Sequence, residues 1–434
     1  MAYDCEVVVI GAGVAGLVAT AVLTQAGVYT QCLEARDRVG GRVFTIHDPL
    51  APLPAELGAE FIHGRPPEIW DLITREGLAV RERNGRFVHM ERGQVQSEEH
   101  AGESMHRLFS DLEAEAARGP DRTFAEFLDR SSYSDAVKLR ATGYVEGFNA
   151  ARKEIIGIAS LAQDAQAADR IDGDRSFTLL DGYDSVVSSL IRGIQGGNEV
   201  IRLNSVVETV EWKPGSATVH IRSRIDGRRE TFRCAQVIVT VPLGVLQASP
   251  DNDGAIRFDP EPADSLSTAR SLAFGHAVRV TLRFDTAFWE QNDAPSGVGF
   301  IYSHTPLFPT WWTQASMITG WSAGPAADGL LGRPGPEIIA QSVAALEQIL
   351  GRKAPEVRAA YFHDWSGDPF SRGAYSYVPA EQIPARQRLA QPVCQTLYFA
   401  GEATNLSGHG STVHGAIESG RRAAQQIIGG ARTR

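Results

Sequence analysis

The first residues that could do chemistry form a glycine-rich turn close to the N-terminus. Gly11-Ala12-Gly13-Val14-Ala15-Gly16 has the spacing G-x-G-x-x-G, follows the apolar run Glu6 to Ile10 and opens a stretch with helical spacing. Glycine lets the backbone approach a pyrophosphate, and a helix N-terminus supplies N–H donors and positive potential. Glu34 stands 23 positions after Gly11, at the end of a second strand, where a carboxylate can accept both ribose hydroxyls of an adenosine. The pattern predicts a site for FAD or NAD, because an acid there disfavours a 2′-phosphate.

A second cluster follows at once, in Arg36-Asp37-Arg38-Val39-Gly40-Gly41-Arg42. The glycine pair exposes backbone N–H groups, and the flanking guanidinium groups can neutralise a diphosphate. This cluster therefore supports the dinucleotide site.

At this point the chain resembles the flavin-containing amine oxidase family, which includes monoamine oxidases, polyamine oxidases and flavin histone demethylases. The resemblance continues in blocks that occur in the family's order at both ends of the chain: Glu56 to Gly64, Asp368 to Tyr377, Tyr398 to Glu402 and Thr412 to Ala416. It implies FAD as the cofactor. The positions that the resemblance assigns to FAD are Gly11, Gly13, Ala15, Gly16, Glu34, Ala35, Arg36, Gly41, Arg42, Gly58, Ala59, Glu60, Phe61, Val207, Trp365, Gly401, Glu402, Thr412 and Val413.

The resemblance also implies a substrate side to the site. Tyr375 matches an aromatic residue that the family places in front of the flavin, and Thr412 stands where monoamine oxidases carry a second such tyrosine. Glu60 and His63 match positions that meet a second amine in polyamine oxidases. The roles of Trp312 and Trp321 stay open.

Two further positions shape the expected chemistry. Ala374 replaces the cysteine that binds flavin covalently in monoamine oxidases, so we expect non-covalent FAD. Phe61 replaces the arginine with which amino acid oxidases grip a carboxylate, which favours an amine over an amino acid.

Arg279 is the main departure from the family. It stands where most members have a lysine beside the flavin, and arginine is larger, planar and permanently charged. It is a candidate catalytic residue, and the alternative is that Arg279, Thr281 and Arg283 form an ordinary solvated strand face.

The elements that must position these residues are an opening β-α-β unit and strands that return to it. We expect a largely helical region from about Glu68 to Leu190, a strand at Val237 to Pro242 that rejoins the first sheet, and a half-buried strand at His276 to Asp285. An apolar strand at Thr396 to Ala400 leads through a glycine-rich turn into a last helix.

The predicted fold class is α/β, a Rossmann-like FAD-binding domain of the glutathione-reductase type interleaved with an α+β substrate-binding domain. The FAD-binding domain is predicted over 1–85, 200–265 and 385–434, and the substrate-binding domain over 86–199 and 266–384.

The composition limits the kinds of partner that the protein is expected to bind. The net charge of −10 argues against nucleic acid or anionic lipid as a partner, and the apolar run Val7 to Leu23 is too short and glycine-rich for a membrane helix. The four cysteines, Cys5, Cys32, Cys234 and Cys394, lie too far apart for a zinc or redox motif, so we expect no metal and a reducing, cytoplasmic location. The oligomeric state is left open.

These observations predict an FAD-dependent enzyme that oxidises a small primary or secondary amine to an imine and then an aldehyde, with dioxygen as acceptor and hydrogen peroxide as product. The alternatives are an amino acid oxidase or a desaturase on the same scaffold, or a flavin-bound protein with little turnover. A histone demethylase is less expected, because the catalytic blocks account for the chain. The sequence does not name the amine.

Overall fold

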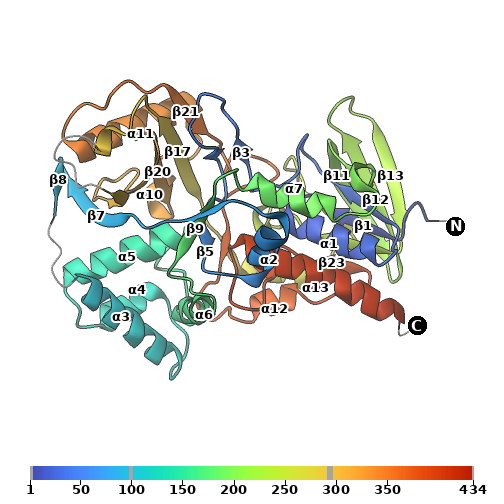
Figure 1. The fold of residues 1–434 in the computed structure, drawn as a ribbon. Coiled ribbons are helices and arrows are strands. Elements are labelled where there is room, and N and C mark those ends of the chain that lie inside the picture. The colour runs from blue at the N-terminus through green and yellow to red at the C-terminus, as the bar shows by residue number, and fades with distance from the viewer. Residues whose placement is uncertain (1–2, 97–100, 291–296, 433–434) are drawn as a thin grey trace.

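The computed structural model describes residues 3–96, 101–290 and 297–432. Two halves lie side by side, one around β1, α1, α13 and the β11–β13 sheet, the other around β7, β17, β20 and helices α3 to α6 (Figure 1). Within the described residues, no helix combines the length and the apolar character needed to cross a membrane.

The first half is built on a five-stranded parallel sheet in the order β10-β2-β1-β14-β23. Its strands are β1 (Val7–Ile10), β2 (Thr30–Leu33), β10 (Ile201–Arg202), β14 (Gln236–Val239) and β23 (Leu397–Phe399). The central strand β1 is buried on both faces, as its unbroken apolar run predicts. The predicted return of the chain to this sheet is confirmed, because β14 and β23 come from distant parts of the sequence.

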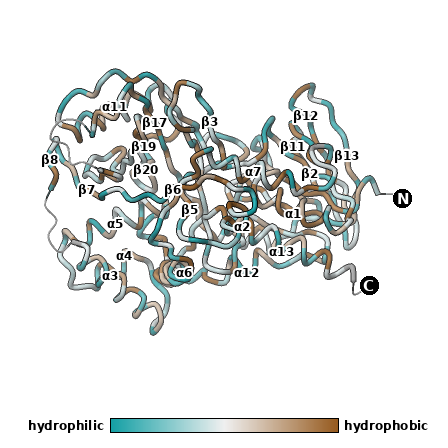
Figure 2. The backbone as a smooth tube through the Cα atoms, viewed as in Figure 1, coloured by the Kyte–Doolittle hydropathy of each residue, from teal (hydrophilic) through white to brown (hydrophobic). Residues whose placement is uncertain are grey.

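Four helices cover one face of this sheet: α1 (Val14–Gln25), α2 (Pro67–Glu76), α7 (Asp184–Arg192) and α13 (Val413–Arg432). Helix α1 is apolar nearly all round, as Figure 2 shows, because α7 and α13 pack on it. A Cβ on Gly420 would lie 2.2 Å from the carbonyl oxygen of Ala15, so glycine there lets α13 approach α1 closely.

The other face packs on a four-stranded sheet and three short helices. These are β11 (Ser205–Lys213), β12 (Ser216–Ser223), β13 (Arg229–Cys234), β15 (Arg257–Asp259), α8 (Leu243–Leu246), α9 (Ala263–Ser271) and α12 (Ala385–Leu389). A turn at Asp226-Gly227 joins β12 to β13, and Gly227 has a φ of 72°.

The second half contains a seven-stranded sheet in the order β21-β17-β20-β19-β18-β7-β8, antiparallel except where β18 pairs with β7. Its strands are β7 (Arg86–Glu91), β8 (Gln94–Val95), β17 (Ala277–Arg283), β18 (Val298–Tyr302), β19 (Thr310–Gln314), β20 (Met317–Ala323) and β21 (Ala359–Phe362). The core beside it includes residues of α10 (Pro325–Asp328), α11 (Gly335–Leu350) and the 3-10 turn η2 (Phe288–Glu290).

The remaining elements connect the halves or cover the second one. The helices are α3 (Ala101–Ala116), α4 (Phe124–Arg130), α5 (Asp135–Asn149) and α6 (Ile158–Asp169), with 3-10 turns η1 (Gly197–Val200) and η3 (Glu402–Thr404). The short strands are β3 (Thr45–Ile46), β4 (Ala55–Glu56), β5 (Ile62–His63), β6 (Val80–Glu82), β9 (Ser176–Leu179), β16 (Ala273–Phe274) and β22 (Ser376–Tyr377).

The region from Glu68 to Leu190 is largely helical, as predicted, and the strands β6, β7, β8 and β9 interrupt its helices. The local sequence does not indicate β7 as a strand, because only Val88 and Met90 are buried in it and they alternate with more exposed residues.

The expectation that the strand now seen as β17 is half-buried is wrong. Its alternate residues Arg279 and Thr281 are 5 % and 2 % exposed, like the apolar residues between them. The strand lies between β21 and β20, and residues on both of its faces are buried. The interpretation of this side as a solvated face is therefore wrong.

Candidate functional site

The glycine-rich turn between β1 and α1 can be made only with glycine at two of its positions. Gly11 has a φ of 99°, and a Cβ on Gly16 would lie 1.9 Å from the carbonyl oxygen of Gly11. Gly13 caps α1 without a side-chain hydrogen bond, and the first turn of α1 has no acidic residue. The N–H groups at this helix end are therefore suited to a phosphate.

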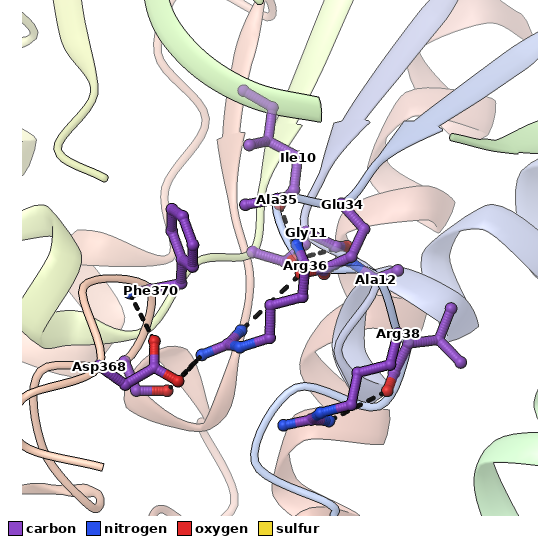
Figure 3. A network of polar contacts seen from close by, with 12 residues as sticks. Ile10, Gly11, Ala12, Glu34, Ala35, Arg36, Arg38, Asp368 and Phe370 are labelled. Atoms are coloured by element: carbon purple, nitrogen blue, oxygen red, sulfur yellow. Dashed lines mark hydrogen bonds and ion pairs between the residues drawn. The ribbon is translucent and has the colours of Figure 1, made fainter. Parts of the chain in front are cut away.

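Glu34 lies beside this turn, at the end of β2, as the sequence predicts (Figure 3). Its Oε2 accepts a hydrogen bond from the Ala12 N–H at 2.7 Å, and its Oε1 accepts one from the Arg36 N–H at 2.9 Å. Burial raises the pKa of Glu34, although these donors and Arg36 act against it. The carboxylate is thus fixed beside the glycine turn, where the sequence predicts that it binds an adenosine ribose.

The guanidinium of Arg36 is held away from the glycine turn by residues of the distant 368–371 segment (Figure 3). Its Nη2 donates to Asp368 at 2.9 Å and to Ser371 at 3.0 Å. Burial raises the pKa of Asp368, but the hydrogen bond from His363 and the charge of Arg36 outweigh it and lower that pKa below its ordinary value. Arg36 therefore joins two predicted blocks instead of standing free.

Arg42 and Glu402 hold a second junction between blocks. Arg42 Nη1 donates to the Ala374 carbonyl at 2.6 Å and to Glu402 Oε1 at 3.1 Å. Glu402 Oε2 accepts from the Ser376 hydroxyl at 2.6 Å and from the Ser411 N–H at 3.0 Å. Although burial raises the pKa of Glu402, the charges of Arg42 and Arg386 lower it below its ordinary value, so the carboxylate is ionised.

Thr412 caps the last helix. Its hydroxyl accepts from the Gly415 N–H at 3.0 Å and donates to the His409 carbonyl at 2.7 Å. Helix α13 begins at Val413 and has no acid in its first turn, which suits an anion, and Gly401 has a φ of 122° just after β23.

The segment from Gly58 to Phe61 contacts Arg42 and Arg279. A Cβ on Gly58 would lie 1.9 Å from the Arg42 carbonyl oxygen and 3.2 Å from the ring of Trp365, and the Ala59 N–H donates to the same carbonyl. Trp365 is buried and donates to the Leu57 carbonyl at 2.7 Å. This close packing leaves the segment no room for a side chain at Gly58.

Arg279 forms a buried ion pair with Glu60. Its Nη2 lies 2.6 Å from Glu60 Oε2, and its Nη1 donates to the Gly58 carbonyl at 2.9 Å. Both side chains are almost fully buried, at 5 % and 3 % exposed. Trp312 Nε1 donates to the same carboxylate at 3.0 Å, and the guanidinium lies 5.3 Å from the Trp312 ring centre. Trp312, whose role the sequence left open, is therefore part of this group.

Aromatic rings continue from this ion pair to the surface. Phe61 contacts Trp312, Phe300 and His63, with ring centres 5.3, 5.8 and 6.1 Å apart. His63 contacts Phe148 at 5.3 Å, and burial lowers the pKa of His63 to about 4, so its ring is neutral at pH 7. Tyr375 donates its hydroxyl to the Phe148 carbonyl at 2.8 Å.

The outer rings of this set are exposed. Tyr144 stacks on Phe148 and Phe87 stacks on Phe300, and the exposed fractions of Tyr144, Phe148 and Phe87 are 49 %, 50 % and 67 %. We call Phe61, Phe87, Tyr144, Phe148, Phe300 and Trp312 the aromatic wall. It leads from solvent to the Glu60–Arg279 pair.

Comparison with known proteins is consistent with this geometry. A family model described as flavin containing amine oxidoreductase matches residues 14–428. The chain belongs to this family. Its cofactor is FAD, and it is an FAD-dependent amine oxidoreductase.

Individual relatives cover nearly all of the chain. It is 28 % identical to polyamine oxidase 4 of Oryza sativa subsp. japonica, over 97 % of this chain and 88 % of that protein. It is 26 % identical to lysine-specific histone demethylase 2 of Homo sapiens, over 98 % of this chain but only 53 % of that protein. The fold matches a solved double mutant of putrescine oxidase with a TM-score of 0.82 and 22 % identity, over 98 % of this chain and 99 % of that one.

The residues present fit FAD. The turn closed by Gly11 and Gly16, the fixed Glu34 carboxylate and the two acid-free helix ends can hold an adenosine, a diphosphate and their charge. The structure brings the motif residues Gly13 and Gly41 together, since a Cβ on Gly41 would lie 3.2 Å from the Gly13 Cα. Ala15 and Ala35 lie within this part of the fold.

One residue predicted to bind FAD has its side chain in the core, and several polar contacts of the site were not predicted. The side chain of Val207 is buried in the core between the two sheets. Sequence reasoning missed Glu56, Asp368 and Arg386 as polar partners, because each acts through residues remote in the sequence. Glu56 and Asp368 each stand at the start of a matched block, which is the one signal that pointed to them.

Proposed function

We propose that this enzyme oxidises a primary or secondary amine with an apolar body to an imine, which hydrolyses to an aldehyde. Dioxygen accepts the electrons and hydrogen peroxide is the second product. The observation that carries the proposal is the aromatic wall together with the closed Glu60–Arg279 pair. Free cysteines, three of them buried, support a reducing cytoplasm as the compartment.

The ion pair occupies two charged side chains that could otherwise bind a charged group of the substrate. A second ammonium group would need an open carboxylate, but Glu60 already binds Arg279 and Trp312. A substrate carboxylate would need an open cation, and Arg279 is occupied in the same pair. The next guanidinium, that of Arg83, lies 5.7 Å from the ring centre of Phe61 and donates to the Thr313 carbonyl. Uncharged apolar bodies therefore suit the wall best.

Bound FAD supplies the two-electron acceptor for the hydride that leaves the carbon next to the amine nitrogen. The chain's own part is to bind and orient the amine and to exclude water. Aromatic surroundings disfavour the ammonium form of a substrate and so present it as the neutral amine. His63 is neutral at pH 7, because burial lowers its pKa, and it adds no opposing positive charge.

The test is an anaerobic panel of three six-carbon compounds: hexylamine, 1,6-diaminohexane and 2-aminohexanoic acid. Hexylamine should bleach the flavin absorbance fastest, and admission of air should restore it with about one peroxide per amine. Faster reduction by 2-aminohexanoic acid would show an amino acid oxidase. Reduction by none of them, or reoxidation without peroxide, would contradict the proposed reaction or its acceptor.

A variant pair tests the aromatic wall. Phe61→Ala removes the ring that contacts three others, and it should raise KM for hexylamine about tenfold, since one buried aromatic contributes on the order of 1–3 kcal/mol. Tyr29→Ala is the control, because Tyr29 is 66 % exposed in the other half. An equal KM in both variants would show that the wall does not bind the substrate.

A further inference from the structure

Two histidines and a glutamate meet at one edge of the second half, outside the amine site. His89 and Glu91 are alternate residues of β7, so their side chains leave the same face of the strand. His304 follows β18 by two residues, and the parallel register pairs Tyr302 with His89. The strand pairing therefore places three potential metal ligands together.

The three ligand atoms form a nearly regular triangle. His89 Nε2 lies 3.0 Å from His304 Nδ1 and 3.3 Å from Glu91 Oε1, and His304 Nδ1 lies 3.2 Å from Glu91 Oε1. A zinc ion about 2.0–2.1 Å from nitrogen and oxygen ligands in a tetrahedron places them about 3.3 Å apart. The observed spacings thus match one face of a zinc tetrahedron.

The chemistry and exposure of the group also fit a metal ion. Two imidazoles and a carboxylate are a ligand set that zinc accepts, with a water molecule as the fourth ligand. The side chains of His89, Glu91 and His304 are 12 %, 32 % and 61 % exposed, so an ion can reach them while one side stays open. The backbone N–H of His304 donates to Glu91 Oε1 at 2.5 Å, which holds the loop and the carboxylate together.

We propose that His89, Glu91 and His304 form a binding site for Zn²⁺ that ties β7 to the loop after β18. The spacing of the cysteines predicted no metal site, and histidine and glutamate residues from distant parts of the chain provide this one. Among the described residues, His89, Glu91 and His304 are the histidine, cysteine or acidic side chains whose ligand atoms, three together, lie close enough to bind one ion. None of these three side chains belongs to the aromatic wall or to the Glu60–Arg279 pair.

The experiment uses the FAD-loaded enzyme after dialysis against a chelator. Zinc is titrated in competition with a colorimetric zinc indicator, and Co²⁺ is added separately to record the visible absorption of a four-coordinate ion. The wild type should bind one Zn²⁺ per chain and unfold at a higher temperature with zinc. His304→Ala should weaken binding at least about tenfold and lose the thermal shift, and its 61 % exposure makes a folding defect unexpected.

His220→Ala is the matched control. His220 and Glu211 form a two-ligand pair at 3.3 Å on the four-stranded sheet, which lacks the third ligand of the proposed site. This variant should bind zinc as the wild type does. Binding by His304→Ala with wild-type affinity, or no zinc binding by the wild type, would overturn the proposal and would leave the amine oxidation result unaffected.

Discussion

The buried pair of Glu60 and Arg279 gives a structural reason for an arginine at a position where the family resemblance implies a lysine. A planar guanidinium can bond the Gly58 carbonyl and the Glu60 carboxylate at once, which a lysine cannot do with the same geometry. The sequence could not reveal this, because the two residues lie 219 positions apart and alternation on β17 resembled a half-exposed strand. The physical reason is tertiary burial, which overrides local pattern.

This pair yields a prediction about stability. Glu60→Gln or Arg279→Met alone leaves one uncompensated buried charge and should lower the free energy of unfolding by about 3–5 kcal/mol. The double variant should lose markedly less than the sum, because no unpaired charge remains. Urea unfolding of the four proteins, each with its FAD content measured, checks this. Additive losses would mean that the two side chains do not interact.

Glu56 gives a prediction about pH. Burial raises the pKa of Glu56 from its ordinary value of 4.5 to about 8, although hydrogen bonds from the Tyr183 N–H and the Thr45 hydroxyl oppose the shift. Between these values the folded chain keeps a proton that the unfolded chain has lost. This group should therefore lower the free energy of unfolding as pH rises from 5 to 8, by up to about 1.4 kcal/mol per pH unit.

The comparison variant is Glu56→Gln, which stays neutral at every pH. Its free energy of unfolding, measured with urea at pH 5, 6, 7 and 8, should fall less steeply than that of the wild type. Glu154→Gln is the control, since the Glu154 side chain is 61 % exposed. Parallel curves for the wild type and Glu56→Gln would show that Glu56 is ionised in the folded state.

At the scale of elements, the chain's strongest patterns predicted the structure well. The β-α-β unit, the return of β14 and β23 to its sheet and the last helix were found from apolar runs beside glycine turns. Strand β7 was missed, because its two buried residues stand among charged ones. Short strands with one weakly apolar face depend on their neighbours in the sheet, which the local sequence does not show.

The turn into α1 offers a test of an element. Gly16→Ala places a Cβ 1.9 Å from the Gly11 carbonyl oxygen, so the turn must shift and the FAD content per chain should fall well below one. Gly143→Ala is the control, because Gly143 lies in α5 with open space where the alanine Cβ would stand, and alanine favours a helix. The flavin absorbance of each purified protein measures the effect. Full FAD content in Gly16→Ala would contradict a tight turn around the cofactor.

At the scale of the whole molecule, the residues predicted to bind the cofactor come together from both ends of the chain. Arg36 and Arg42 reach residues more than 300 positions away, and Glu402 joins the Arg42 and Ser376 segments. The sequence predicted this interleaving from the order of the motif blocks, and the boundaries of the two domains stay a prediction. A cofactor that binds across such junctions should stabilise the fold as a unit.

Removal of FAD should therefore lower the melting temperature of the whole protein in one transition. Ala374 has no nucleophilic atom, so acid precipitation should leave the flavin in the supernatant, and the FAD-free protein for melting is prepared by dialysis at high salt. Added FAD should restore stability by about 2.7 kcal/mol at a hundred times its Kd, because it binds the folded chain alone. Calorimetry over a range of FAD concentrations measures this rise. Flavin retained in the acid pellet would show a covalent bond. A melting temperature that does not change with FAD concentration would show that the contacts between the distant segments form fully without the cofactor.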